Sequence, residues 1–176
     1  MLNALISVGA ERHHLLMPDE PELQPGERFA AMPVADFPFP HGPFRCPRHE
    51  RYCELARASR DAPEGVVGAQ WHHTLTAADF AACEFHHADW LSVATASVAV
   101  LEAAGPHATF DDLAEACDQP GLPQKELHWL SSLFEDPIHW YQGSPGVTNG
   151  QHRLCALRGA GAELVAADIS DWVKQP

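Results

Sequence analysis

The chain has 176 residues, 45% of them hydrophobic, so it can bury the core of one globular domain and is not disordered as a whole. Its 24 acidic residues against 11 Lys and Arg give a formal net charge of −13. Such a charge disfavours direct nonspecific binding of nucleic acid, because the phosphates would be repelled. No segment approaches the roughly 20 apolar residues of a membrane span. The five cysteines, odd in number and unevenly spaced, are typical of reduced thiols in the cytoplasm.

The N-terminal part of the chain combines many prolines with several phenylalanines. Proline breaks long helices and central strands, whereas disordered segments seldom carry so many aromatic rings. We therefore expect residues 1–70 to be an extended arm that packs its Phe side chains onto the domain. Within the arm, residues 48–59 predict one short helix and residues 61–70 a loop.

The middle of the chain has the periodicity of helices. Thr76 with Asp79, and Thr109 with Asp112, have the spacing of a capping box, with Asp in place of the usual Glu or Gln. Gly105-Pro106, Pro120-Gly121 and Asp136-Pro137 are the expected helix ends. The predicted helices begin after Thr76, cover 94–104, begin again after Thr109, and cover 124–134.

The C-terminal part of the chain changes character after Pro137. The aromatic segment 138–142 predicts a strand, residues 143–146 a turn, Val147-Thr148 a short returning strand, 151–158 a helix and 163–169 a final strand. Residues 71–176 are thus expected to hold a helical core and a small C-terminal β-β-α-β unit. The predicted fold class is α+β, a mostly helical single globular unit that carries the N-terminal arm.

The most pointed motif is Asn149-Gly150-Gln151-His152-Arg153, a turn that leads into a helix. The first turn of a helix offers unpaired backbone N–H groups and the positive end of the helix dipole. His and Arg at such a tip predict a cradle for a phosphate or carboxylate group, with the glycine allowing close backbone approach. These five residues are the predicted ligand-binding site.

The segment that reads NGQHRLCAL, with Gly161 and a strand after it, resembles the phosphate-binding segment of the ParB/sulfiredoxin superfamily. The matching residues are Asn149, Gly150, His152, Arg153 and Ala156. The resemblance is local, confined to positions 143–169, and it implies a nucleotide as the ligand and a link to DNA partition or mobile elements. The corresponding motif of sulfiredoxin-like enzymes is similar but has a catalytic Cys directly before the His. Gln151 stands there in this chain, so that chemistry is not expected.

Histidine and cysteine, the usual ligands of transition metals, suggest a second kind of site. Cys46, His49 and Cys53, with His41 nearby, form the predicted zinc set. A second arrangement is Cys83 with His86 and His87. In the predicted C-terminal helix, Cys155 follows His152 by three residues, so a thiol and an imidazole can meet there. Packing roles are the alternative for each of these cysteines.

Three functions follow from these patterns. The leading prediction is a cytoplasmic ligand-binding or regulatory protein that holds a nucleotide phosphate or another anion at Asn149–Arg153, with DNA-associated or protein partners and no membrane. The first alternative is a phosphoryl-transfer or nuclease-type enzyme on the same cradle, whose carboxylate the sequence does not reveal. The second alternative is an acidic protein-interaction module without a small ligand. Whether the protein is an enzyme is left open.

Overall fold

A computed structural model describes residues 25–40, 46–118, 121–141 and 144–170, and the statements below concern those residues. They contain seven α-helices, three 3₁₀ helices and two strands, which confirms the mostly helical α+β prediction. The elements in chain order are η1 (Pro25–Arg28), β1 (Phe29–Pro33), η2 (Val34–Asp36), α1 (His49–Ala58), α2 (Glu64–Thr74), α3 (Ala77–Ala81), η3 (Glu84–His87), α4 (Trp90–Ala104), α5 (Phe110–Cys117), α6 (Gln124–Glu135), α7 (Gln151–Ala160) and β2 (Leu164–Asp168).

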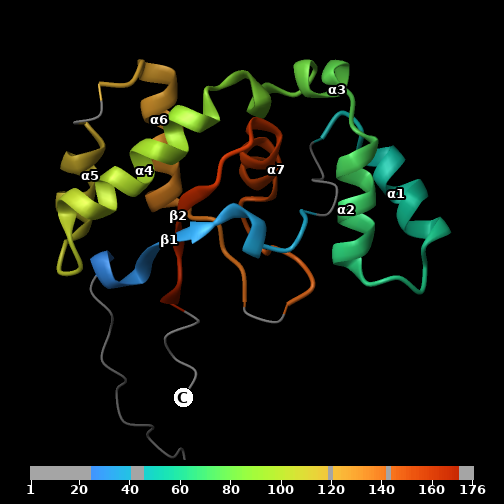
Figure 1. Ribbon diagram of the computed structural model, residues 1–176, viewed down its shortest axis with the longest axis horizontal. Coiled ribbons are helices and arrows are strands. Elements are labelled where there is room, and N and C mark those ends of the chain that lie inside the picture. Colours follow the sequence, from blue (N-terminus) through green and yellow to red (C-terminus); the bar gives the residue numbers. More distant parts are fainter. Residues whose placement is uncertain (1–24, 41–45, 119–120, 142–143, 171–176) are drawn as a thin grey trace, which may run out of the picture.

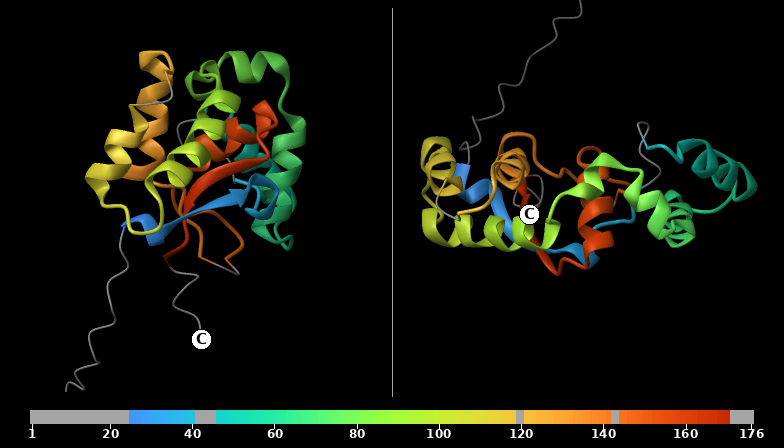
Figure 2. Two further views of the ribbon diagram at one scale, coloured as in Figure 1. Left: turned by 60° about the vertical axis from the view of Figure 1, so that its left-hand side comes forward. Right: turned by 90° about the horizontal axis from the view of Figure 1, so that it is seen from above.

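The elements lie along one long axis. Figure 1 shows α4, α5 and α6 at one end, the two strands and α7 in the middle, and α1 with α2 at the other end. Viewed from above in Figure 2, the α1–α2 hairpin stands apart from the body and meets it beside α7. No helix of the described residues is long and apolar enough to cross a bilayer.

Both predicted capping boxes are present. The Thr76 hydroxyl accepts a hydrogen bond from the backbone N–H of Asp79, and the backbone N–H of Thr76 donates to the Asp79 carboxylate. Thr109 and Asp112 form the same pair of bonds. The helical pattern after Thr76 is not one helix, however. It divides into α3, η3 and α4, because Asp89 caps a new helix start through the N–H of Ser92.

The sheet joins the two ends of the described chain. β1 from the predicted arm pairs antiparallel with β2, in a register that places Phe29 opposite Asp168 and Pro33 opposite Leu164. On α4, the hydroxyl of Ser97 accepts the backbone N–H of Ala166. β2 therefore has a strand on one side and a helix contact on the other.

The strand predicted over 138–142 is reduced to an isolated bridge between His139 and Asn149, and Gln142 lies outside the described residues. The loop that follows is held by side chains: Trp140 donates its indole N–H to the carbonyl of Ser144. Of the predicted C-terminal unit, the helix and the final strand are present as α7 and β2, and β1 supplies the partner of β2.

The loop predicted over 61–70 is also wrong, because Glu64–Thr74 form α2. Two glycines and two valines give this segment poor helix propensity. Packing outweighs propensity here: a side chain at Gly68 would come within 2.9 Å of the carbonyl oxygen of Phe39. Val67 and Trp71, one turn apart, are buried on the same face.

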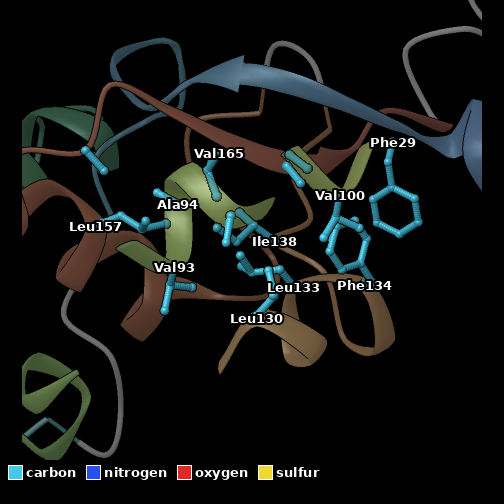
Figure 3. Close-up of a cluster of buried hydrophobic side chains, with 14 of the residues drawn as sticks. Phe29, Val93, Ala94, Val100, Leu130, Leu133, Phe134, Ile138, Leu157 and Val165 are labelled. Carbon is cyan, nitrogen blue, oxygen red and sulfur yellow. The ribbon is translucent and has the colours of Figure 1, made fainter. Parts of the chain in front are cut away.

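Two separate hydrophobic clusters hold the fold. The larger one packs β1, β2, α4, α5, α6 and α7 together, and Figure 3 shows its side chains converging between the sheet and the helices. Phe29 and Phe37 are buried in it, as expected for the arm. The smaller cluster consists of Tyr52, Val67, Trp71 and Cys155, so it joins the α1–α2 hairpin to α7 through a single cysteine.

Candidate functional site: the flank of α7

Helix α7 begins at Gly150, whose φ of 80° is a left-handed conformation that suits glycine. A Cβ at this position would also lie 2.9 Å from the side chain of Ile138. Gly161, with a φ of 75°, ends the helix and has open space around it. The predicted turn and helix are present, and the close approach at Gly150 is to the chain's own core.

The guanidinium of Arg153 does not stand open at the helix tip, and that part of the prediction is wrong. Its side chain is only 6% exposed and points to the end of α6. There it donates to the carbonyl oxygen of Ser132 and, over 3.2 Å, to the carboxylate of Asp136. Burial lowers the pKa of Arg153, and the charge of Asp136 opposes that effect. The guanidinium that was expected to bind an anionic ligand therefore already pairs with a carboxylate of the chain itself.

Asn149 and Gln151 also have internal partners. The Asn149 amide donates to the carboxylate of Asp136 over 2.6 Å and to the carbonyl of Pro137 over 2.9 Å. The Gln151 amide donates to the carbonyl of Val147 over 3.1 Å. These side chains pin the loop before α7, so the residues predicted to bind a ligand also have a structural role.

His152 faces a different part of the molecule. Its ring stacks on Phe85 with 4.2 Å between centroids and 13° between planes. It also lines a small cavity of about 10 Å³ between α7 and the α1–α3 segment, which we call the seam pocket. The residues that line the seam pocket are Cys46, Arg48, Trp71, Leu75, Asp79, Phe80, Cys83, His86, His152 and Cys155.

Three of the five cysteines meet at the seam pocket, and all five are free thiols. Cys83 and Cys155 are buried and Cys46 is half-buried. Burial, with a smaller effect of the other two thiols, raises the pKa of Cys155 to about 12. Burial also raises the pKa of Cys46. Cys46 and Cys155 are therefore neutral thiols at pH 7, not activated nucleophiles.

The imidazole of His86, beside the thiols, is held uncharged. Burial lowers the pKa of His86 to about 4, and the nearby His72 and His152 add to the effect. The His86 ring lies against α7 at Gly159, where an added Cβ would come within 3.0 Å of it. A neutral imidazole is the form that accepts a proton or binds a metal ion.

One residue in the wall of the seam pocket has a polar atom without a partner. Trp71 is fully buried, and its indole Nε1 finds no hydrogen-bond acceptor among the described residues. A buried donor in this state costs free energy unless something accepts its proton. On the rim, Arg48 forms an ion pair with the buried carboxylate of Asp79, which ties the start of α1 to α3.

The predicted zinc set Cys46, His49 and Cys53 is divided by the structure. The Cys53 sulfur lies 3.4 Å from His49 Nε2, one turn apart on α1, whereas Cys46 lines the seam pocket. His41 lies outside the described residues. As the side chains stand, the described ranges contain no group of three His, Cys, Asp or Glu arranged to hold a metal ion.

In the sequence analysis, the residues of the seam pocket belonged to three separate candidate groups of Cys and His. Cys46 belongs to the first predicted metal set, Cys83 and His86 to the second, and His152 with Cys155 to the C-terminal helix. The structure brings these five together, while it turns His87 away to contact the carbonyl of Ala81. Trp71 was missed, because nothing in the sequence distinguishes it from a core tryptophan.

No family model, no curated protein and no solved structure matches this chain. The resemblance to the ParB/sulfiredoxin superfamily therefore remains a prediction from the motif at Asn149–Leu157.

Proposed function

We propose that this protein is a ligand-binding regulatory protein and that its ligand occupies the seam pocket. The observation that carries the proposal is the lining of that cavity: three thiols, two imidazoles and an unpartnered indole N–H, contributed by separate segments. An ordinary apolar core would hold no such concentration of ligand-forming side chains.

The position of the seam pocket gives ligand binding a structural consequence. The smaller hydrophobic cluster joins the α1–α2 hairpin to α7, and the seam pocket lies beside it with Trp71 and Cys155 in common. A ligand that contacts both the hairpin and α7 binds more tightly when the hairpin is docked on the body than when it is detached. The ligand favours the docked state by this difference in affinity. Ligand binding would thereby control which surfaces of the α1–α2 hairpin and of the body are accessible to a partner protein.

Binding of an anion at the tip of α7, as predicted from the sequence, is a more specific function of the same ligand-binding class. The internal pairing of Arg153 with Asp136 gives it less support than the seam pocket has. Nucleotide binding, the DNA link, the phosphoryl-transfer or nuclease-type enzyme and the protein-interaction module all stay predictions.

A thermal-shift screen tests the proposal. The full chain is heated with zinc and other divalent ions, inorganic phosphate and nucleoside triphosphates. A ligand at about 100 times its Kd stabilises by about 2.7 kcal/mol, which raises the Tm of a chain of this size by about 5–10 °C. We expect the shift to disappear in His152→Ala and Cys83→Ser and to persist in His107→Ala, whose side chain is exposed away from the seam pocket.

Two results would contradict the proposal. The first is that no compound in the screen stabilises the wild type. The second is a shift of equal size in wild type, His152→Ala and Cys83→Ser. A shift by nucleotides alone that survives Cys83→Ser but is lost in Arg153→Lys would instead support the anion site at the tip of α7.

A further inference from the structure

We infer that the seam pocket is a site for one soft divalent metal ion of the zinc class, bound by the sulfurs of Cys46, Cys83 and Cys155 and by the imidazole of His86. This inference rests on the proposed function and names its ligand. It replaces the ligand set expected from the sequence, of which it keeps only Cys46.

The backbone already brings the ligand residues to one place. Cys83 and His86 are three residues apart across η3, where the N–H of His86 bonds to the carbonyl of Cys83 over 3.0 Å. Cys83 precedes η3 in an extended conformation, and both residues line the same cavity. Cys155 enters from α7 and Cys46 from the segment before α1.

The size of the cavity selects an ion. A volume of about 10 Å³ is close to the minimum for a single water-sized group and excludes a nucleotide or another organic molecule. Three sulfurs and one nitrogen are a ligand set that favours zinc and other soft ions over magnesium or calcium, which prefer oxygen.

The charge of such a centre also matches its surroundings. Binding breaks three S–H bonds and forms three sulfur–metal bonds, with three protons released to solvent and no change of oxidation state. Three thiolates and a divalent cation carry a net charge of −1. Trp71, whose indole N–H has no acceptor, lines the same cavity and is a donor available to a thiolate, while Arg48 and Asp79 on the rim neutralise one another.

The described side chains do not form a finished coordination shell. Protonated thiols have no attraction for one another, so their rotamers follow packing. Binding of the ion therefore requires the ligand side chains to move from the positions that they hold without it.

The test is metal binding by the full chain and its five single Cys→Ser variants. We expect one zinc or cobalt ion per wild-type chain, and a cobalt complex with a strong thiolate-to-metal charge-transfer band. The band should weaken and the affinity should fall at least about tenfold in Cys46→Ser, Cys83→Ser and Cys155→Ser. Cys53→Ser and Cys117→Ser, which remove thiols outside the seam pocket, are the matched controls and should bind as the wild type does.

X-ray absorption at the zinc edge of the wild type keeps the inference testable if a variant does not fold. Three sulfurs at about 2.3 Å and one nitrogen at about 2.0 Å are expected. Absence of tight binding, a shell of nitrogen and oxygen, or loss of binding in Cys53→Ser would overturn the inference. If no zinc-class metal binds but another small ion of the screen, such as phosphate, stabilises the wild type and not Cys83→Ser, the metal inference fails and the proposed function stands.

Discussion

His152 and Phe85 form a parallel ring stack, 4.2 Å apart, that links α7 to η3 beside the seam pocket. The neighbouring Arg153 points to the end of α6 instead. Successive residues on a helix are rotated by about 100°, so two adjacent polar residues at a helix start serve different neighbours. The motif that suggested one cradle therefore contributes to two structures: a buried arginine anchor and one wall of the seam pocket.

The stack should contribute measurable coupling. In a double-mutant cycle of Phe85→Leu and His152→Ala, we expect an interaction energy of about 0.5–1.5 kcal/mol in urea unfolding. Phe80 with His86, at 4.6 Å and 42°, provides a less parallel pair for comparison. Strict additivity at Phe85 and His152 would show that the stack contributes nothing to docking.

Arg153 is expected to act on stability. Arg153→Met removes the donor to the Ser132 carbonyl from a buried position, which costs about 1–3 kcal/mol. Asp136 is 74% exposed, so Asp136→Asn should cost less than about 1 kcal/mol. Chemical denaturation of both variants measures the difference. Arg153→Met with the stability of the wild type but without a nucleotide shift would point back to a ligand role at the tip of α7.

Gly150 and Gly161, at the two ends of α7, allow a matched comparison of two substitutions. Gly150→Ala combines a positive φ with a Cβ 2.9 Å from Ile138, so we expect a loss of about 2–4 kcal/mol. Gly161→Ala has the same kind of backbone strain in open space and should lose about 1–2 kcal/mol. Thermal unfolding compares them, and equal losses would show that the loop before α7 yields easily.

Asp168 should make stability depend on pH. Burial alone would raise its pKa, but hydrogen bonds from Ser170 and the guanidinium of Arg28 outweigh burial and hold the pKa below its usual 3.8. A carboxyl whose pKa is lower in the folded state stabilises fully above its unfolded pKa, and the contribution is lost as pH falls through the folded pKa. The stability gap between wild type and Asp168→Asn should therefore shrink below about pH 4. A gap that stays constant from pH 6 to pH 2 would contradict this account.

Local chemistry made much of the secondary structure predictable. The Thr76 and Thr109 capping boxes, and the helices now seen as α1, α4 and α6, follow from interactions within a few residues. The glycines at 150 and 161 likewise mark the bounds of α7.

The parts that depend on distant contacts were not predictable in this way. β1 and β2 pair although they lie near opposite ends of the described chain, and no local pattern names the partner of a strand. α2 forms against the propensity of its residues and packs Gly68 closely against the carbonyl of Phe39, a contact that propensity does not include. The seam pocket needs Cys46, Cys83 and Cys155, from three segments far apart in the sequence, to meet, which only the tertiary fold determines.

The most direct test of the regulatory claim is hydrogen exchange of the full chain with and without one equivalent of zinc. If the ligand of the seam pocket ties the hairpin to the body, backbone amides of α1 and α2 should exchange several-fold more slowly with zinc, while those of α5, at the far end of the molecule, should not change. Zinc bound at the seam cysteines with unchanged exchange in α1 and α2 would contradict the account.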